Sequence, residues 1–188
     1  MKNKLLRFFS LFAAVLFMLA TLSCANADKQ GSDGDTAAKA FSDMTLEEIL
    51  SEIYAKDGYG NMLTELINAP VPSDPYDFSN HLIITEITDQ NVAGYLGTTD
   101  VEFEYAIASE AAINPTTYLL CLIKLREGEN AKDAAELIKK SADPNRWVCT
   151  GVSPSHVYTD YSGDIVILVM SDTDGEALIG AFRDIANR

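Results

Sequence analysis

The chemistry of Cys24 is set by the residues that precede it. A basic start at residues 2–7 is followed by an apolar run over residues 8–22, shorter than the roughly 20 residues of a membrane span. The sequence Ala20-Thr21-Leu22-Ser23 fits the pattern that bacterial lipoprotein signal peptidase recognises. We therefore expect residues 1–23 to be a lipoprotein signal peptide. Lipid on the Cys24 sulfur would then anchor the exported protein to the outer face of the cell membrane.

A second cleavage site leaves a secreted form open. The sequence Ala25-Asn26-Ala27 has the A-x-A pattern of ordinary signal peptidase, so cleavage after Ala27 would release the protein without lipid. The apolar run ends directly at Cys24, however, and the residues that follow resemble a tether. The order of these segments favours the anchored form.

Cys149 and His156 are the residues from which a thiol enzyme could be built, because an imidazole next to a thiol activates it as a nucleophile. Seven residues of extended chain hold them too far apart to touch, and no third group that would orient His156 stands out. We expect Cys149 to be buried, since it follows Trp147 and Val148 in what we interpret as packed structure. We expect Cys121 to be a buried free thiol too, and a disulfide between the two stays open.

Five aromatic side chains could line a groove for a peptide or a glycan: Tyr54, Tyr59, Tyr76, Phe78 and Trp147. Four of them lie near the prolines at positions 70, 72 and 75, and the fifth follows Arg146. The alternative is that they cover the edge of the core, as aromatic residues beside prolines commonly do.

The acidic run Asp172, Asp174 and Glu176 around Gly175 is similar to a calcium loop but incomplete. Two acids precede the glycine where an EF-hand has three acids or amides at alternating positions, so we expect them to favour the start of a helix. The chain has two histidines and no Cys-x-x-Cys, and we expect no metal site and no cofactor. The sequence at Gly151 and Ser153 lacks the second glycine of a hydrolase elbow, so we assign no catalytic residue there.

The chain is strongly acidic, with a formal net charge of −14 over 188 residues. Loss of the three basic residues of the signal peptide, at positions 2, 4 and 7, takes the charge of the mature chain to −17. Such a surface is repelled by phosphate backbones, so we expect no nucleic acid among the partners.

The elements that would position these residues begin after a Gly-, Ser- and Asp-rich tether over residues 24–43. We expect a single globular domain over residues 44–188. Thr45 and Glu48 form a capping box for a helix whose apolar stripe runs from Leu46 to Tyr54 and which Gly58 and Gly60 end. Strands are expected over residues 81–87, 101–107, 117–125, 157–161 and 164–170. A brief helix capped by Thr88 and Asp89 ends at Gly97, and helices follow over residues 131–140 and after Ser171.

The order β-β-α-β-β-α of the second half predicts an α+β fold, a two-layer sandwich with a mainly antiparallel sheet and helices packed on one face. Residues 165–170 are apolar on both faces, which indicates an interior strand. The helix after Thr45 is our candidate to cover the second face, with a second copy of the chain as the alternative.

Several stretches in this order resemble the bacterial lipoprotein family catalogued as domain of unknown function 4358. They are residues 87–97, Ala108-Ser109-Glu110, residues 124–128, residues 143–149 and residues 167–171. The resemblance implies a surface-exposed lipoprotein of a bacterium with one membrane. It carries no activity and no catalytic residues.

The sequence thus predicts a lipid-anchored, non-enzymatic binding or interaction module that contacts an unknown envelope protein or glycan. The alternative is a cell-envelope hydrolase or thiol enzyme that uses Cys149. A homodimer is left open.

Overall fold

The computed structural model describes residues 39–74, 79–113 and 116–188. Cys24, the predicted signal peptide and most of the predicted tether therefore lie outside the described residues. The strands are β1 (Leu82–Glu86), β2 (Phe103–Ala111), β3 (Leu119–Leu125), β4 (Val157–Ser162) and β5 (Ile165–Met170). The helices are α1 (Leu46–Tyr54), α2 (Asn61–Asn68), α3 (Val92–Leu96), α4 (Ala131–Ser141) and α5 (Gly175–Ala186), with 3-10 turns at Phe41–Asp43 and Pro154–His156. No helix within these residues is long and apolar enough to cross a membrane.

The five strands form one open sheet in the order β1-β2-β3-β5-β4, and all neighbours are antiparallel. The predicted α+β class and antiparallel sheet are confirmed. Strands β3 and β5 lie inside the sheet and are buried along almost their whole length, as their apolar runs require. Strands β1 and β4 form its two edges.

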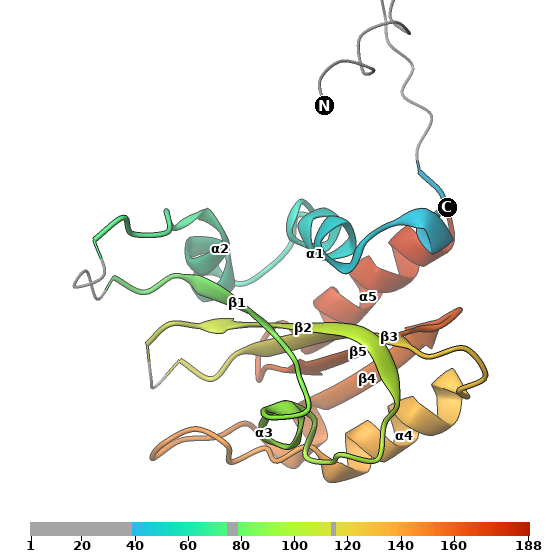
Figure 1. The fold of residues 1–188 in the computed structure, drawn as a ribbon. Helices are drawn as coiled ribbons and strands as arrows, with labels where there is room; N and C mark the ends of the chain where they lie inside the picture. Colours follow the sequence, from blue (N-terminus) through green and yellow to red (C-terminus); the bar gives the residue numbers. More distant parts are fainter. Residues whose placement is uncertain (1–38, 75–78, 114–115) are drawn as a thin grey trace, which may run out of the picture. The chain divides into compact units, whose positions relative to one another are not determined.

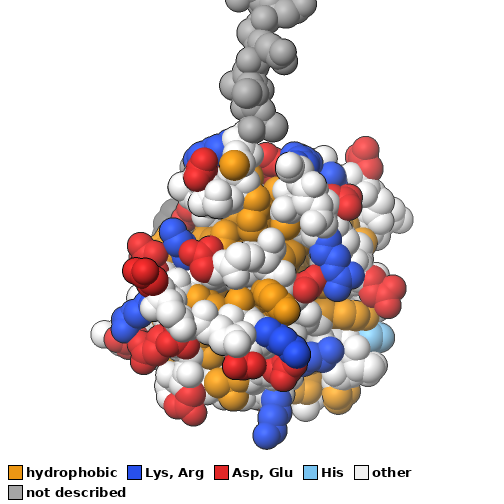
Figure 2. Space-filling view, turned by 90° about the vertical axis from the view of Figure 1, so that its right-hand side faces the viewer, with side chains coloured by type: hydrophobic (Ala, Val, Ile, Leu, Met, Phe, Trp, Pro, Cys, Tyr) orange, Lys and Arg blue, Asp and Glu red, His pale blue; other side chains and the backbone are white. Residues whose placement is uncertain are grey.

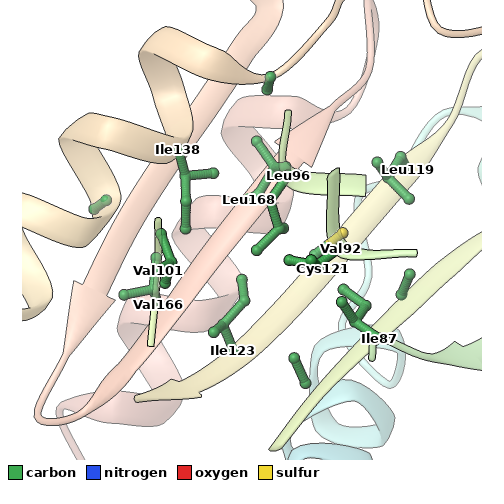
Figure 3. Close-up of a cluster of buried hydrophobic side chains, with 14 of the residues drawn as sticks. Ile87, Val92, Leu96, Val101, Leu119, Cys121, Ile123, Ile138, Val166 and Leu168 are labelled. Carbon is green, nitrogen blue, oxygen red and sulfur yellow. The ribbon is translucent and has the colours of Figure 1, made fainter. Parts of the chain in front are cut away.

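Helices cover both faces of the sheet (Figure 1). On one face, α3 and α4 pack on a core that includes Cys121, Ile123, Val166 and Leu168 (Figure 3). On the other face, α1 and α5 pack on Leu120, Leu122, Ile165 and Ile167. The prediction that α1 covers the second face is confirmed. Helix α5 joins it there rather than lying beside α4, because the alternating residues of β3 and β5 present a wide apolar surface on that side too.

A bulge in β2 changes which residues share a face. The pairing of β2 with β3 shifts between Phe103 and Tyr105, so one extra residue lies in β2 at this point. Val101 and Phe103 consequently pack on the α4 side, while Tyr105 and Ile107 pack on the α1 side. The apolar alternation of these four residues in the sequence predicts that they share one face, and this is wrong because the extra residue reverses the alternation.

Two predicted helix starts also differ from the structure. Helix α3 is preceded by Asn91 and not by Thr88 and Asp89: the Asn91 amide accepts from the Thr88 N–H at 2.7 Å and donates to the Glu86 C=O at 3.0 Å. Gly97 ends this helix as predicted, at φ 73°. Helix α5 begins after Asp174, and the Ser171 hydroxyl instead accepts from the Asp174 N–H at 3.1 Å in the turn before it.

The start of the domain is anchored by local contacts. The capping box of α1 is present, with hydrogen bonds of 2.7 and 3.2 Å between Thr45 and Glu48. Phe41 packs edge-on against Phe182 of α5, with 5.6 Å between ring centroids. Met44 packs on the same core. The compact unit accordingly spans Ala38–Arg188 and includes residues ahead of position 44.

Candidate functional site

Among the described residues, no strand pairs with the outer hydrogen-bonding side of β1. On its inner side the Ile87 N–H donates to the Ala106 C=O and the Ala112 N–H donates to the His81 C=O, both at 2.8 Å. Alternate residues of an antiparallel strand bond to the same neighbour, so Leu82 and Ile84 direct their N–H and C=O groups away from β2. Among the described residues, no hydrogen bond occupies these groups of Ile84. The open row ends at the Glu86 C=O, which accepts from Asn91.

The side chains of β1 leave apolar surface beside this open row. Ile84 is 56% exposed and Ile83 is 41% exposed. Alternate residues of a strand lie on the same face of the sheet. Ile83 therefore shares the α3 face with Ile87, which belongs to the core there. Ile84 shares the α1 face with Leu82, which packs on the core of that side. An exposed edge with two isoleucines is uncommon, because edge strands are usually protected by charge, proline or a covering segment.

The opposite edge, β4, carries charge beside one of its outward groups. The Ser171 N–H donates to the His156 C=O, so odd-numbered residues of β4 point outward. The outward N–H of Tyr161 donates to the Asp160 carboxylate at 2.9 Å, and Asp160 pairs with Arg183 of α5. The two edges of the sheet therefore differ in their side chains: β4 has a charged pair beside Tyr161, whereas β1 has two exposed isoleucines, and we take β1 as the candidate for pairing.

Next to β1, on the face of the sheet that α3 covers, lies a group of side chains that we call the Arg146 cluster. Its members are Tyr95, Glu110, Arg146 and Trp147. Arg146 donates to Glu110 Oε2 at 2.8 Å and to the Gly94 C=O at 3.2 Å. Its guanidinium lies 4.8 Å from the Tyr95 ring centroid and 5.5 Å from that of Trp147. The Tyr95 hydroxyl donates to Glu110 Oε1 at 2.8 Å, and burial raises the pKa of Tyr95.

The Arg146 cluster is a positioning element for the edge. Glu110 lies directly opposite Ile83 in the sheet. The Arg146 and Glu110 side chains are only 18% and 24% exposed. The cluster therefore ties α3, β2 and the loop after α4 together behind β1. Sequence reasoning singled out Trp147 but missed Arg146 and Glu110, because their pairing joins segments 36 residues apart.

Cys149 is exposed, so the prediction that it is buried is wrong. It lies in a loop closed by a hydrogen bond of 2.9 Å from the Val152 N–H to the Pro144 C=O, and its φ of 65° is in the left-handed region. Trp147 and Val152 of this loop belong to the core, while Val148, next to Cys149, is 73% exposed. The prediction that both remaining cysteines are free thiols is confirmed, and burial raises the pKa of Cys121.

His156 has an orienting carboxylate that sequence reasoning missed, but among the described residues it lacks the contact with the thiol that a thiol enzyme would need. Its Nδ1 lies 2.7 Å from Asp172 Oδ1, and this hydrogen bond lowers the pKa of Asp172, which also accepts from the Ser153 N–H. No hydrogen bond in the described part of the chain joins His156 to Cys149. The geometry thus supplies an oriented imidazole and an exposed thiol but does not bring them together.

The predicted aromatic groove is not assembled as one surface. Tyr54 and Tyr59 lie on the α1 side, where the Tyr54 hydroxyl bonds Ser109 Oγ at 2.8 Å and the Tyr118 hydroxyl at 2.7 Å. Trp147 belongs to the core on the opposite face. Tyr76 and Phe78 lie outside the described residues. The Tyr59 hydroxyl donates to the Ile53 C=O, so both described tyrosines on the α1 side have structural partners.

The acidic run before α5 diverges instead of forming a cation site. Asp172 pairs with His156, while the buried Asp174 accepts from the Gly60 N–H at 2.6 Å and from the Thr173 hydroxyl at 2.5 Å. Within the residues the structure describes, no three His, Cys, Asp or Glu side chains are grouped as metal ligands. Asp174 thus connects the start of α2 to the start of α5.

Comparison with protein-family models finds no matching family, and searches of curated proteins and of solved structures find no match. The resemblance to the lipoprotein family therefore stays a prediction from the sequence.

Proposed function

We propose that this chain is a non-enzymatic binding module of the cell envelope, displayed on the outer face of the membrane by lipid on Cys24. Its binding surface is the open side of β1. An extended segment of a partner protein adds there as a sixth strand. The observation that carries this proposal is Ile84, whose side chain is 56% exposed at an edge strand and whose main-chain groups point outward.

Strand addition suits this edge energetically. Leu82 and Ile84 offer two N–H and two C=O groups, each worth about 1 kcal/mol net when paired. Covering the exposed parts of Ile83 and Ile84 adds about 1 kcal/mol each. The sum of about 6 kcal/mol corresponds to a Kd of roughly tens of micromolar before the entropy lost on association is subtracted, and that loss weakens binding further. Such an affinity fits a reversible contact.

A library of displayed linear peptides of roughly ten residues, longer than an average strand, tests the proposal. The bait is the mature chain with Cys24→Ser, immobilised without lipid. We expect peptides selected on this bait to lose binding to Ile84→Pro, because proline removes the outward N–H without breaking a bond to β2.

The matched control is Thr159→Pro, which removes an outward N–H from the opposite edge, β4. It should leave binding unchanged. Failure to select any peptide that distinguishes Ile84→Pro from Thr159→Pro would contradict the proposal.

One observation favours the alternative of a thiol enzyme. Cys149 is exposed and holds a left-handed backbone conformation, a kind of strain that often accompanies functional sites. Its alkylation rate, treated in the Discussion, tests this alternative directly.

A further inference from the structure

We infer that the segment bound at β1 carries a basic side chain two residues from an apolar one, with the apolar side chain over Ile84 and the basic one facing Glu86 and Glu47. This inference rests on the proposed function, because it specifies which strand the β1 edge accepts.

The alternation of β1 fixes the spacing. Ile84 and Glu86 are two residues apart and lie on the α1 face of the sheet. Side chains of an added strand stand next to those of β1 on the same face, at the same two-residue interval. An apolar residue beside Ile84 therefore places the residue two positions along beside Glu86.

The charge near Glu86 is concentrated by a neighbouring helix. Glu86 lies opposite Ile107, and Tyr105 lies two residues before Ile107 on the same face of β2. The Tyr105 hydroxyl donates to Glu47 Oε1 of α1 at 2.7 Å. This hydrogen bond holds the pKa of Glu47 below its usual value, so the carboxylate is ionised at neutral pH. It also raises the pKa of Tyr105 to about 12, and the negative charges of Glu47 and Glu86 add to that effect. Both carboxylates thus act on Tyr105 of β2, and Glu86 carries its own charge at the end of the open row.

The acids on and just before β2 are paired with basic side chains, unlike Glu47 and Glu86. Glu102 pairs with Arg126 at 2.6 Å, Glu104 with Lys124 at 3.6 Å, and Glu110 with Arg146 at 2.8 Å. Figure 2 shows the same interspersion of acidic and basic side chains over the face that it displays. No ion pair among the described residues includes Glu47 or Glu86. An incoming basic side chain is the complement that these two lack.

A second copy of the chain is a poor occupant of this edge. Each mature copy carries a formal net charge of −17, which is the −14 of the full chain less the three basic residues of the signal peptide, so two copies repel one another. A glycan, which has no peptide N–H and C=O row, would leave the hydrogen-bonding side of β1 unmatched. The observations favour a basic extended segment of a different protein.

The same displayed library tests this inference when the residue preferences of the selected peptides are determined at each position. On the wild-type bait we expect Lys or Arg to be enriched two residues from an Ile, Val or Leu among peptides that depend on Ile84. On a Glu86→Lys bait the enrichment should change to Asp or Glu. In titration, a selected Lys peptide should bind Glu86→Lys about three- to tenfold more weakly, as expected for loss of a rim charge pair. The difference should shrink at high salt.

The matched control is Glu129→Lys, which makes the same change of net charge in the exposed turn between β3 and α4. It should bind the Lys peptide within about twofold of wild type, since distant exposed charges are largely screened. Peptides that depend on Ile84 but show no charge preference would overturn this inference and leave the proposed function standing. A selection without any Ile84-dependent peptide would overturn the proposed function itself. Self-association of the wild type that Ile84→Pro abolishes would show a second copy as the occupant and overturn the inference.

Discussion

Replacement of Arg146 by alanine tests whether the cluster behind β1 holds the fold. The substitution removes the bond to Glu110, the bond to the Gly94 C=O, and the contacts with the rings of Tyr95 and Trp147. It leaves Glu110 with the Tyr95 hydroxyl as its remaining cluster partner.

The size of the effect follows from these contacts. The bond to Glu110, partly screened at 18% and 24% exposure, contributes about 1 kcal/mol, and the bond to Gly94 about 1 kcal/mol more. Two cation–π contacts add roughly 0.5–1 kcal/mol each. The side-chain entropy regained by truncation offsets part of this sum. We expect Arg146→Ala to lower the free energy of unfolding by about 2–3 kcal/mol.

Arg126→Ala is the matched control. Arg126 also donates to a carboxylate, Glu102, at 2.6 Å and to a backbone carbonyl, that of Phe103, at 3.1 Å, but its side chain is 62% exposed. Its removal should cost less than about 0.5 kcal/mol.

Urea denaturation measures both variants, followed by circular dichroism and by the fluorescence of Trp147, which is the single tryptophan of the chain. The two signals should change together, as for a domain that unfolds in one step. Equal losses for Arg146→Ala and Arg126→Ala would refute the reasoning, because burial of the pair and its ring contacts would then contribute nothing.

Three further predictions concern the α1 side, alkaline stability and the thiols. Phe41→Ala should lower the free energy of unfolding by about 1–2 kcal/mol in thermal or urea unfolding, because it removes a half-buried ring packed on Phe182; an unchanged stability would show that this contact is dispensable. Burial raises the pKa of Tyr54 to about 12 and that of Tyr118 further, so their protonated forms stabilise the fold fully below pH 10 and lose that contribution as pH rises toward 12. The loss from Tyr54 alone should lower the free energy of unfolding by about 2 kcal/mol between pH 10 and pH 12, measured as a falling midpoint of urea denaturation. A midpoint that does not change above pH 10 would contradict this prediction. In the Cys24→Ser chain, iodoacetamide should label the exposed Cys149 in the native state at the rate of a free thiol. It should label the buried Cys121 only after unfolding. Labelling of Cys149 much faster than that of a model thiol would favour the thiol enzyme.

Features that depend on local spacing could be predicted from the sequence. The capping box at Thr45, the apolar stripe of α1, and the left-handed Gly97 at the end of α3 each follow from residues within a few positions of one another. The buried run of β5 likewise indicated an interior strand without knowledge of its neighbours.

Features that depend on distant segments could not be predicted in this way. The bulge at Phe103 and Tyr105 arises from the pairing of β2 with β3 and leaves no signature in the alternation of β2 itself. The exposure of Cys149 follows from the closure of its loop between Pro144 and Val152, whereas the adjacent Trp147 suggested packed structure.

The candidate site belongs to this second group. The sequence of β1 does not show whether Ile84 lies inside a sheet or at its edge, because strand order is a property of the whole chain. The Arg146 cluster and the hydrogen bond from Tyr105 to Glu47 join separate elements, so the sequence does not show them for the same reason. Sequence reasoning therefore placed a binding surface at the aromatic residues, where the structure shows hydroxyls with internal partners.

Amide hydrogen exchange of β1, measured residue by residue with and without a library-selected peptide, tests the central claim most directly. The account predicts that the Ile84 N–H, which has no partner among the described residues, exchanges rapidly in the free protein and becomes protected on binding. The N–H groups of Ile83 and Thr85, which already point to β2, should change little. Protection that leaves Ile84 unchanged and falls instead on β4 or on the loop around Cys149 would contradict the account.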